Sequence, residues 1–177
     1  MAVRELLRLG HPVLRRVARP LDPAEARSPE TRRLVDDMVD TLRAAGGIGL
    51  AAPQIGESVR LAIIEIPGGA TRYGELEPMP LTVFVNPEIE VLDDATRGYW
   101  EGCLSVPGLR GYVERPQRVR VRFHDLDGQA HAFELAGFAA TVFQHEFDHL
   151  DGRLYVDLVE PRKLVFESEL ERHLAGD

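Results

Sequence analysis

A His-Glu-x-x-His run at residues 145–149 constrains this chain more than any other feature. Residues four apart share one face of an α-helix, so His145 and His149 can reach one divalent metal, and Glu146 can move protons for a water molecule activated there. The pattern alone is only moderately specific, because it also occurs on solvated helix faces. Here, residues 138–150 are largely apolar and predict a buried helix in which both histidines need a partner. A metal ion is the simplest partner.

The sequence downstream of this helix narrows the class of metal site. Gly152 fits the longer pattern of the metzincin proteases, but Tyr155 stands where that pattern requires a third histidine. A glutamate ligand on a following helix is not evident either, since we expect the nearest acids, Asp151, Asp157 and Glu160, in a turn and a strand. The third ligand must therefore come from elsewhere in the chain.

Cys103, the single cysteine, is the best candidate for that ligand. A lone cysteine is more often a small buried hydrophobe. However, Gly102 before it and Pro107-Gly108 after it suit a side chain that is presented from a loop or bulge. One cysteine and two histidines leave a tetrahedral position open, as in catalytic zinc sites and unlike structural ones.

A glycine-rich segment, residues 47–56, has the glycine spacing of a dinucleotide-binding turn but the wrong context. That fingerprint follows a strand and opens a helix, whereas here an amphipathic helix that begins near Ser28 comes first and a strand at residues 59–66 comes after. We therefore reject nucleotide binding. Glycines let a substrate backbone pass close by, and the Gln54 amide can donate to a developing oxyanion beside a metal. Taken alone, the segment would be a helix C-cap and turn with an exposed glutamine.

Together the three segments resemble the peptide deformylase family. The family pattern has G-φ-G-φ-A-A-x-Q, E-G-C-φ-S and Q-H-E-x-D-H in this order, and here these match residues 47–54, 101–105 and 144–149. The likeness extends from residue 9 to residue 157, nearly the whole chain. Residues 98–100, Gly-Tyr-Trp, depart from many bacterial members, which often carry an acidic residue there.

The resemblance implies a hydrolase of protein biosynthesis that removes the N-formyl group from the initiator methionine of nascent polypeptides and releases formate. Glu146 would act as acid and base, and Gln54 and the Leu104 backbone N–H would stabilise the oxyanion. The metal ligands would be Cys103, His145 and His149. The resemblance implies Fe(II), with Ni or Co as substitutes and Zn giving a poorer enzyme, although the ligand chemistry alone favours Zn(II).

An apolar pocket near the metal would take the substrate methionine, which is flexible and apolar. Its expected walls, each of which could equally be core packing, are Ile48, Tyr99, Trp100, Phe138 and Val142. The peptide beyond would add along a sheet edge or along the segment with Gly47 and Gly49. Arg110 either lines this downstream groove or is an exposed loop arginine. The expected partners are N-formylmethionyl nascent peptides, with a transient ribosome contact.

Glu101 and Arg115 are expected to form an ion pair that braces the Cys103 segment. Asp148 would either support the metal site indirectly or be solvated.

Composition limits the function classes. A chain of 177 residues, 44% hydrophobic and 28% charged, fits a single soluble domain over residues 1–177. The net charge of -8 speaks against broad nucleic-acid binding, and no apolar run is long enough to span a bilayer. A thiolate ligand is easiest to keep in a reducing compartment, so we expect a cytoplasmic location.

We expect an α+β fold in which mostly antiparallel strands surround a central metal-binding helix, with a helix at the C-terminus. Strands are expected at residues 59–66, 81–92, 118–124 and 131–135, with a hairpin turn at residues 125–128. Residues 67–80 would form a surface loop, and residues 162–174 an amphipathic helix.

Two alternative functions remain open at this point. One is a zinc metallopeptidase acting on unformylated peptides, and the other is a non-catalytic metal-binding or ribosome-associated protein. Glu146 and Gln54, which metal storage does not need, weigh against the second.

Overall fold

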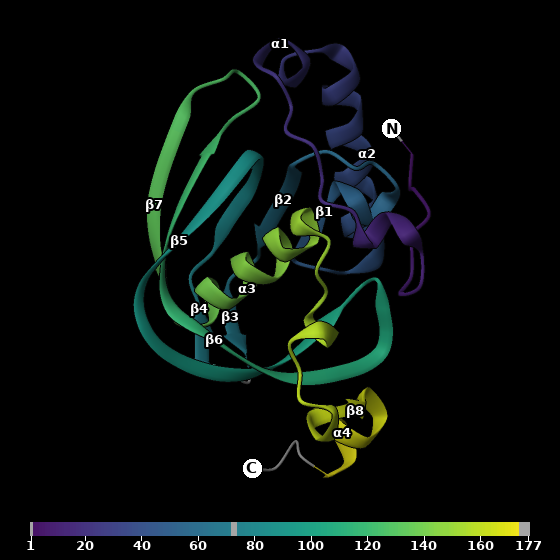
Figure 1. The fold of residues 1–177 in the computed structure, drawn as a ribbon, viewed down its shortest axis with the longest axis vertical. Coiled ribbons are helices and arrows are strands. Elements are labelled where there is room, and N and C mark those ends of the chain that lie inside the picture. Colours follow the sequence, from purple (N-terminus) through teal and green to yellow (C-terminus); the bar gives the residue numbers. More distant parts are fainter. Residues whose placement is uncertain (1, 72–73, 174–177) are drawn as a thin grey trace.

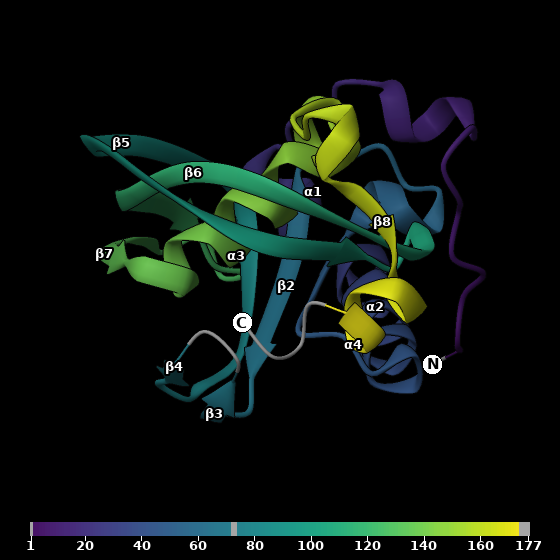
Figure 2. The same cartoon turned by 90° about the horizontal axis from the view of Figure 1, so that it is seen from below.

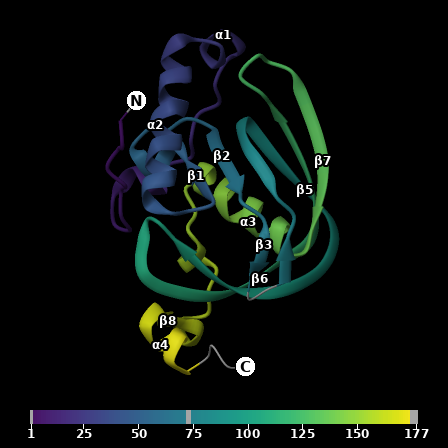
Figure 3. The same ribbon diagram turned by 180° about the vertical axis from the view of Figure 1, so that it is seen from behind.

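The computed structural model describes residues 2–71 and 74–173 (Figure 1). In this part of the chain, six strands form one antiparallel sheet in the order β1-β2-β5-β6-β7, and β8 pairs with β6. These strands are β1 (Gly49–Ala51), β2 (Leu61–Ile66), β5 (Met79–Cys103), β6 (Val106–His124), β7 (Ala130–Ala136) and β8 (Leu164–Phe166). The long strands β5 and β6 curve around α3, as Figures 1 and 3 show. The α+β fold with a largely antiparallel sheet around a central helix is thus confirmed.

The described chain also contains four α-helices and five short 3-10 turns. The α-helices are α1 (Pro23–Ala26), α2 (Pro29–Ala45), α3 (Gly137–Asp148) and α4 (Glu167–His173). The 3-10 turns are η1 (Pro12–Arg15), η2 (Ala52–Ile55), η3 (His149–Asp151), η4 (Tyr155–Asp157) and η5 (Pro161–Lys163). No helix among the described residues is both long and apolar enough to cross a membrane.

Helix α2 begins and ends at residues that suit those roles. The Ser28 side chain accepts a hydrogen bond from the Thr31 N–H, and Pro29 occupies the first helical position. Gly46 ends the helix in the left-handed conformation, with φ of 70°. This turn brings the chain directly into the glycine-rich segment.

Strand β2 lies between two layers of apolar side chains, which explains its almost uninterrupted apolar sequence. Leu61 and Ile63 belong to the core that includes Met38 and Leu42 of α2, whereas the even-numbered residues of β2 belong to the core around α3. The strand therefore fixes both helices relative to the sheet.

Aromatic rings fix the position of α3. The ring of Phe84 on β5 lies 5.3 Å from that of Phe143 and 5.6 Å from that of Phe147, centroid to centroid. Residues two positions apart point to opposite sides of a helix. Packing Phe143 and Phe147 against the sheet therefore turns His145 and His149 to the other side.

Two predicted segments differ from the structure near β5. Residues 67–80 are not a plain loop: β3 (Gly69–Thr71) pairs with β4 (Gly74–Leu76), and β5 already begins at Met79. Residues 72–73 lie outside the described residues. The strand predicted at residues 81–92 continues to Cys103, because register shifts in its pairing with β6 let it bend without ending.

The predicted helix at residues 162–174 is wrong in its first half. Residues 164–166 form β8, which pairs with residues 109–111 of β6, and α4 begins only at Glu167. An available edge of β6 outweighs the amphipathic pattern there. Residue 174 lies outside the described residues. Figure 2 shows β8 running beside β6.

Two smaller predictions concern turns. Asp157 does not lie in a strand as expected; it ends η4, and Glu160 precedes η5. The hairpin turn at residues 125–128 is confirmed, since the Gly128 N–H donates to the Asp125 carbonyl in the connection from β6 to β7.

Candidate active site

Three metal-donating side chains converge near the C-terminal end of α3. His145 lies on α3, His149 begins the 3-10 turn that continues it, and Cys103 ends β5. One donor atom from each lies within 4.8 Å of the other two, and Cys103 Sγ lies 3.4 Å from His149 Nε2. The pairing of β5 with β6 shifts register between Glu101 and Cys103. The thiol is therefore presented from a bulge, one of the two settings that its neighbours predict.

The donor set fits a divalent cation. One sulfur and two imidazole nitrogens suit borderline-soft metals such as zinc and its first-row neighbours. Among the described residues, Glu146 Oε2 is buried at the same site without a hydrogen-bond partner, as expected where a further polar group binds. Burial lowers the pKa of His149 well below its usual value. Its imidazole is therefore neutral, as a metal ligand must be.

A buried charge network orients His145. Its Nδ1 lies 2.7 Å from Glu101 Oε2, which leaves Nε2 to face the donor cluster. Glu101 in turn accepts two hydrogen bonds from Arg115, at 2.6 and 3.0 Å. Arg115 also donates to Asp148 at 2.7 Å. The predicted ion pair between Glu101 and Arg115 is thus confirmed, and Asp148 belongs to the same buried network and is not solvated.

The pKa values in this network follow from burial and charge. Burial acts to lower the pKa of His145, but its contacts with Cys103 and Glu101 raise that pKa well above its usual value. Burial acts to raise the pKa of Glu101, but His145 and Arg115 lower it overall. The negative surroundings that favour a proton on His145 would equally favour a divalent cation in its place.

Glu146 lies against strand β1. A Cβ atom added to Gly49 would lie only 2.5 Å from the Glu146 carboxyl carbon, so the carboxyl group occupies the space where a side chain would be. Burial raises the pKa of Glu146 to about 7. A carboxyl group with such a pKa can both take and give a proton near neutral pH.

Gln54 lies in η2 and is almost completely buried, with 1% of its surface exposed. Its Oε1 accepts from the Ala51 N–H at 2.8 Å. Its Nε2 consequently points to Ser105 Oγ, 3.2 Å away, and to Cys103 Sγ, 3.6 Å away. The alternative of an exposed glutamine in a turn is therefore wrong, because this amide is held at the donor cluster.

A cavity of about 500 Å³ opens beside this cluster. It is lined by the following residues that the sequence singled out: Gly47, Ile48, Gly49, Gln54, Trp100, Cys103, Leu104, Arg110, Phe138, Val142, His145 and Glu146. Tyr99 does not line it. Successive strand residues face opposite sides of a sheet, so Trp100 faces the cavity while the buried Tyr99 packs its ring 5.1 Å from Phe138 and donates to Gln117.

The sequence analysis missed two polar side chains of the cavity. Thr141 precedes His145 by one helical turn and shares its face, a signal that helical spacing carries. Glu167 reaches the cavity through the pairing of β8 with β6, for which the sequence holds no local signal.

A sheet that wraps around a helix bearing two histidines and a buried glutamate, with a cysteine and a glutamine at the same cavity, defines a metal-dependent hydrolase. The family profile described as Polypeptide deformylase matches residues 3–165. The chain is 43% identical to the peptide deformylase of Leptospira biflexa over 169 residues, covering 96% of this chain and 94% of the relative. This chain therefore belongs to the peptide deformylase family, whose members remove the N-formyl group from nascent polypeptides.

Solved structures agree. A ligand-bound crystal structure of class I type b peptide deformylase from Acinetobacter baumannii matches with a TM-score of 0.84 and 35% identity, covering 90% of this chain and all of that one (100%). A structure of the Acinetobacter protein with Met-Ala-Ser bound matches with a TM-score of 0.82 and 34% identity, covering 89% of this chain and 99% of that one. The fold, the enzyme class and the site geometry thus point to one activity.

Proposed function

We propose that this chain hydrolyses the formyl group of N-formylmethionyl nascent peptides with the residues assembled at the cavity. Water is added across the formamide bond, and the products are formate and a free amino terminus. The observation that carries the proposal is that Glu146, Gln54, Cys103 and His145 line one cavity, with His149 completing the donor cluster behind Cys103 and His145.

Glu146 would manage the protons of the reaction. A divalent cation held by Cys103, His145 and His149 would supply Lewis acidity, lowering the pKa of water and polarising the formyl group. The Glu146 carboxylate takes a proton from the attacking water and later gives it to the leaving amine nitrogen. Its raised pKa, near 7, supports both roles. Gly49 supports them too, because it leaves the carboxyl group its space.

Gln54 and Leu104 would stabilise the negative oxygen that develops on the formyl carbon. The hydrogen bond from Ala51 orients the Gln54 amide so that its N–H groups face the site before substrate arrives. Donors fixed in advance need no reorganisation during the reaction. The Leu104 backbone N–H, next to Cys103 at the cavity, would be the second donor.

The methionine side chain would occupy the apolar part of the cavity, between Ile48, Trp100, Phe138 and Val142. Such walls select size without reading charge. The rest of the peptide would run along the segment of Gly47 and Gly49 as an added strand, since β1 pairs only with β2 among the described strands. Binding through the backbone would let the enzyme accept many nascent chains.

Fe(II) would be the native metal, with Ni or Co as working substitutes and Zn giving a poorer enzyme. The donor set of one sulfur and two nitrogens suits all four, so the choice rests on family resemblance. Reconstitution with each metal under anaerobic conditions, followed by turnover measurements, tests this order of activities.

The proposal includes a cellular location and a transient partner. Residues 1–177 would act as one catalytic domain in the cytoplasm, where the Cys103 thiol stays reduced. Because a nascent chain is presented by the ribosome, the enzyme would contact ribosomes transiently. Cosedimentation with ribosomes at low and high salt tests that contact.

The decisive experiment measures formate release from formyl-Met-Ala-Ser by the anaerobic Fe(II) protein, beside Glu146→Gln, Gln54→Ala and Glu160→Gln. Glu146→Gln keeps the size of the side chain next to Gly49 and removes its proton chemistry. We expect formate release from the parent and a loss of about 100-fold or more in turnover for both Glu146→Gln and Gln54→Ala, with iron still bound. Glu160→Gln, an exposed change outside the cavity, should match the parent.

Cleavage of unformylated peptides without formate release would instead favour a metallopeptidase. Iron binding without any turnover would favour a non-catalytic metal protein. Unchanged turnover in Gln54→Ala would remove Gln54 from the mechanism while leaving the reaction in place.

A further inference from the structure

A charged pair lines part of the same cavity. Arg110 on β6 donates from Nε to Glu167 Oε1 at 2.9 Å, and its Nη2 contacts the same oxygen. Glu167 is the first residue of α4 and is brought there by the pairing of Arg110 with Val165 of β8. Both side chains line the cavity.

The Arg110 guanidinium lies over the backbone of Gly102. A Cβ atom at Gly102 would lie 1.5 Å from Arg110 Nη1, so a larger residue there would displace the arginine. Gly102 immediately precedes Cys103. The charge of Arg110 is therefore held over the backbone of the residue that precedes Cys103.

These two charges do not suit a methionine side chain, which is apolar. The apolar wall of the cavity comes from other residues, including Ile48, Trp100 and Phe138. If the proposed function holds, on which this step rests, the peptide that follows the formyl-methionine passes the charged pair. The side chains of Arg110 and Glu167 are 35% and 37% exposed, so a passing charge would be only partly screened from them.

We propose that Glu167 is a specificity-determining residue that neutralises Arg110 towards the downstream peptide. With both residues present, the charges cancel, and acidic and basic residues after the methionine are accepted about equally. Without Glu167, the exposed guanidinium attracts acidic residues and repels basic ones. Without Arg110, the remaining carboxylate has the opposite preference. The C-terminal segment would thus set the range of nascent chains that the enzyme accepts.

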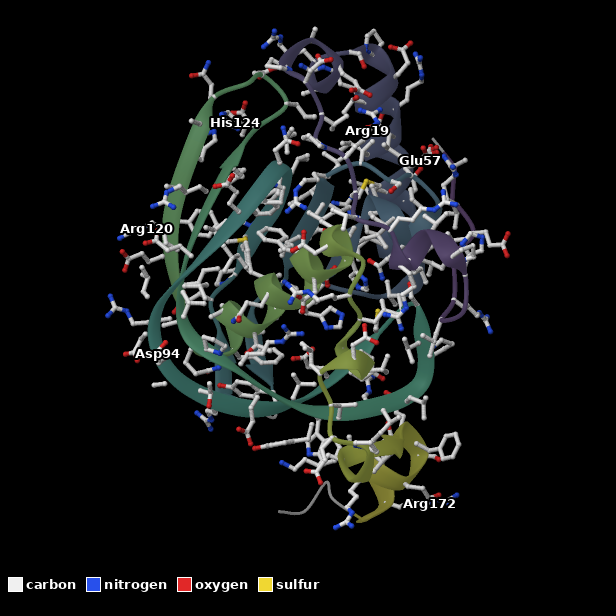
Figure 4. All side chains as sticks on the ribbon, viewed as in Figure 1. Arg19, Glu57, Asp94, Arg120, His124 and Arg172 are labelled. Carbon is white, nitrogen blue, oxygen red and sulfur yellow. The ribbon has the colours of Figure 1, made fainter. Side chains whose placement is uncertain are left out.

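The test compares kcat/KM for three peptides: formyl-Met-Ala-Ser, formyl-Met-Asp-Ser and formyl-Met-Lys-Ser, with a second series that carries the charge at the third position. Each protein's values for the charged peptides are divided by its own value for the neutral peptide, so a general loss of activity cancels. The proteins are the parent, Glu167→Gln, Arg110→Gln and the double variant. Glu169→Gln, two residues along α4 and paired with Arg172 (labelled in Figure 4), is the matched control.

We expect the ratio of kcat/KM for the acidic peptide to kcat/KM for the basic peptide to rise about 3- to 10-fold in Glu167→Gln. This is the scale of one unit charge acting at a partly exposed site. The ratio should fall by a similar factor in Arg110→Gln and return to the parent value in the double variant. Both shifts should shrink as salt is raised. The ratio for Glu169→Gln should equal that of the parent.

Unchanged ratios in both single variants, with formyl-Met-Ala-Ser still hydrolysed, would overturn the inference and leave the pair only a tether for α4. If Glu167→Gln loosens α4, Arg110→Gln still tests the opposite shift. Failure of the parent to release formate from any of the peptides would instead overturn the proposed function itself.

Discussion

The carboxyl group of Glu146 lies where the side chain of residue 49 would be if that residue were not glycine. A Cβ at Gly49 would sit 2.5 Å from both Cδ and Oε1 of Glu146. The position of the Glu146 carboxyl group on α3 thus requires a glycine at residue 49 of β1. The sequence suggests only that Gly49 makes room for substrate.

Gly49→Ala should therefore displace the Glu146 carboxyl group. We expect turnover to fall about 100-fold or more, as when a general base is misplaced, with the metal still bound. The measurement is kcat for formyl-Met-Ala-Ser together with metal content. Gly47→Ala is the graded control: its Cβ would approach two flexible leucine side-chain ends at 3.0 Å and meet the Gly49 carbonyl oxygen at an ordinary 3.6 Å, so its loss of turnover should be much smaller. Equal losses in both variants would show that backbone shape and not the carboxyl position decides activity.

Local sequence patterns predict much of this site and of the fold. The two histidines, Glu146 and the capped start of α2 at Ser28 each depend on spacing or cap chemistry that a few neighbouring residues specify. Ligand chemistry already proposed Cys103 and Gln54 as members of the site, and the family resemblance joined these separate segments to the helix motif. Core packing then groups Cys103 with both histidines and places Gln54 and Glu146 at the cavity that Cys103 and His145 line.

Other features depend on pairing between distant strands and are not visible locally. The bend of β5 through residues 92–103 rests on register shifts against β6, and β8 exists because β6 offers it an edge. The pairing of β8 with β6 also places Glu167 at the cavity. The prediction that Tyr99 lines the cavity is wrong. Successive residues of a strand face opposite sides of the sheet, and here Trp100 faces the cavity while Tyr99 is buried on the other side.

Arg115 bonds both Glu101 and Asp148, and no other cation among the described residues bonds both. Arg115→Met should leave two buried carboxylates without it. We expect a loss of about 3–5 kcal/mol in the free energy of unfolding. The affinity for Co(II) should also fall about 10- to 100-fold, since Glu101 orients His145.

Urea denaturation and Co(II) titration measure these two effects. Arg118→Gln is the control on the same strand: Arg118 is 57% exposed and paired with Glu134, so removing it should cost less than about 1 kcal/mol. Charge removal at Glu101 should weaken Co(II) binding to a similar extent. Normal Co(II) affinity in Arg115→Met would separate the network from the metal site.

Asp157 gives a pH-dependent contribution to stability. Burial acts to raise the pKa of its carboxyl group, but Arg15 and the Leu154 N–H lower it overall. Because the folded pKa is depressed, the stabilisation is present above the unfolded pKa of about 4 and is lost as pH falls through the folded pKa. Asp157→Asn should cost about 1 kcal/mol at pH 7 and progressively less below about pH 4. Urea midpoints of both proteins between pH 7 and pH 3 test this, and a constant difference across that range would contradict it.

The ring of Tyr155 packs against the imidazole of His145. Its ring is nearly parallel to that of His145, at 24° with centroids 6.0 Å apart, and its hydroxyl donates to the Leu109 carbonyl at 3.1 Å. Tyr155→Phe removes only the hydrogen bond and should cost about 1 kcal/mol in the free energy of unfolding. Tyr155→Ala removes the buried ring as well and should cost about 3–5 kcal/mol. Because the alanine variant also frees the imidazole to turn, its Co(II) affinity should fall while that of the phenylalanine variant stays near the parent value. Equal Co(II) affinities in all three proteins, measured by titration below the unfolding transition, would show that Glu101 alone orients His145.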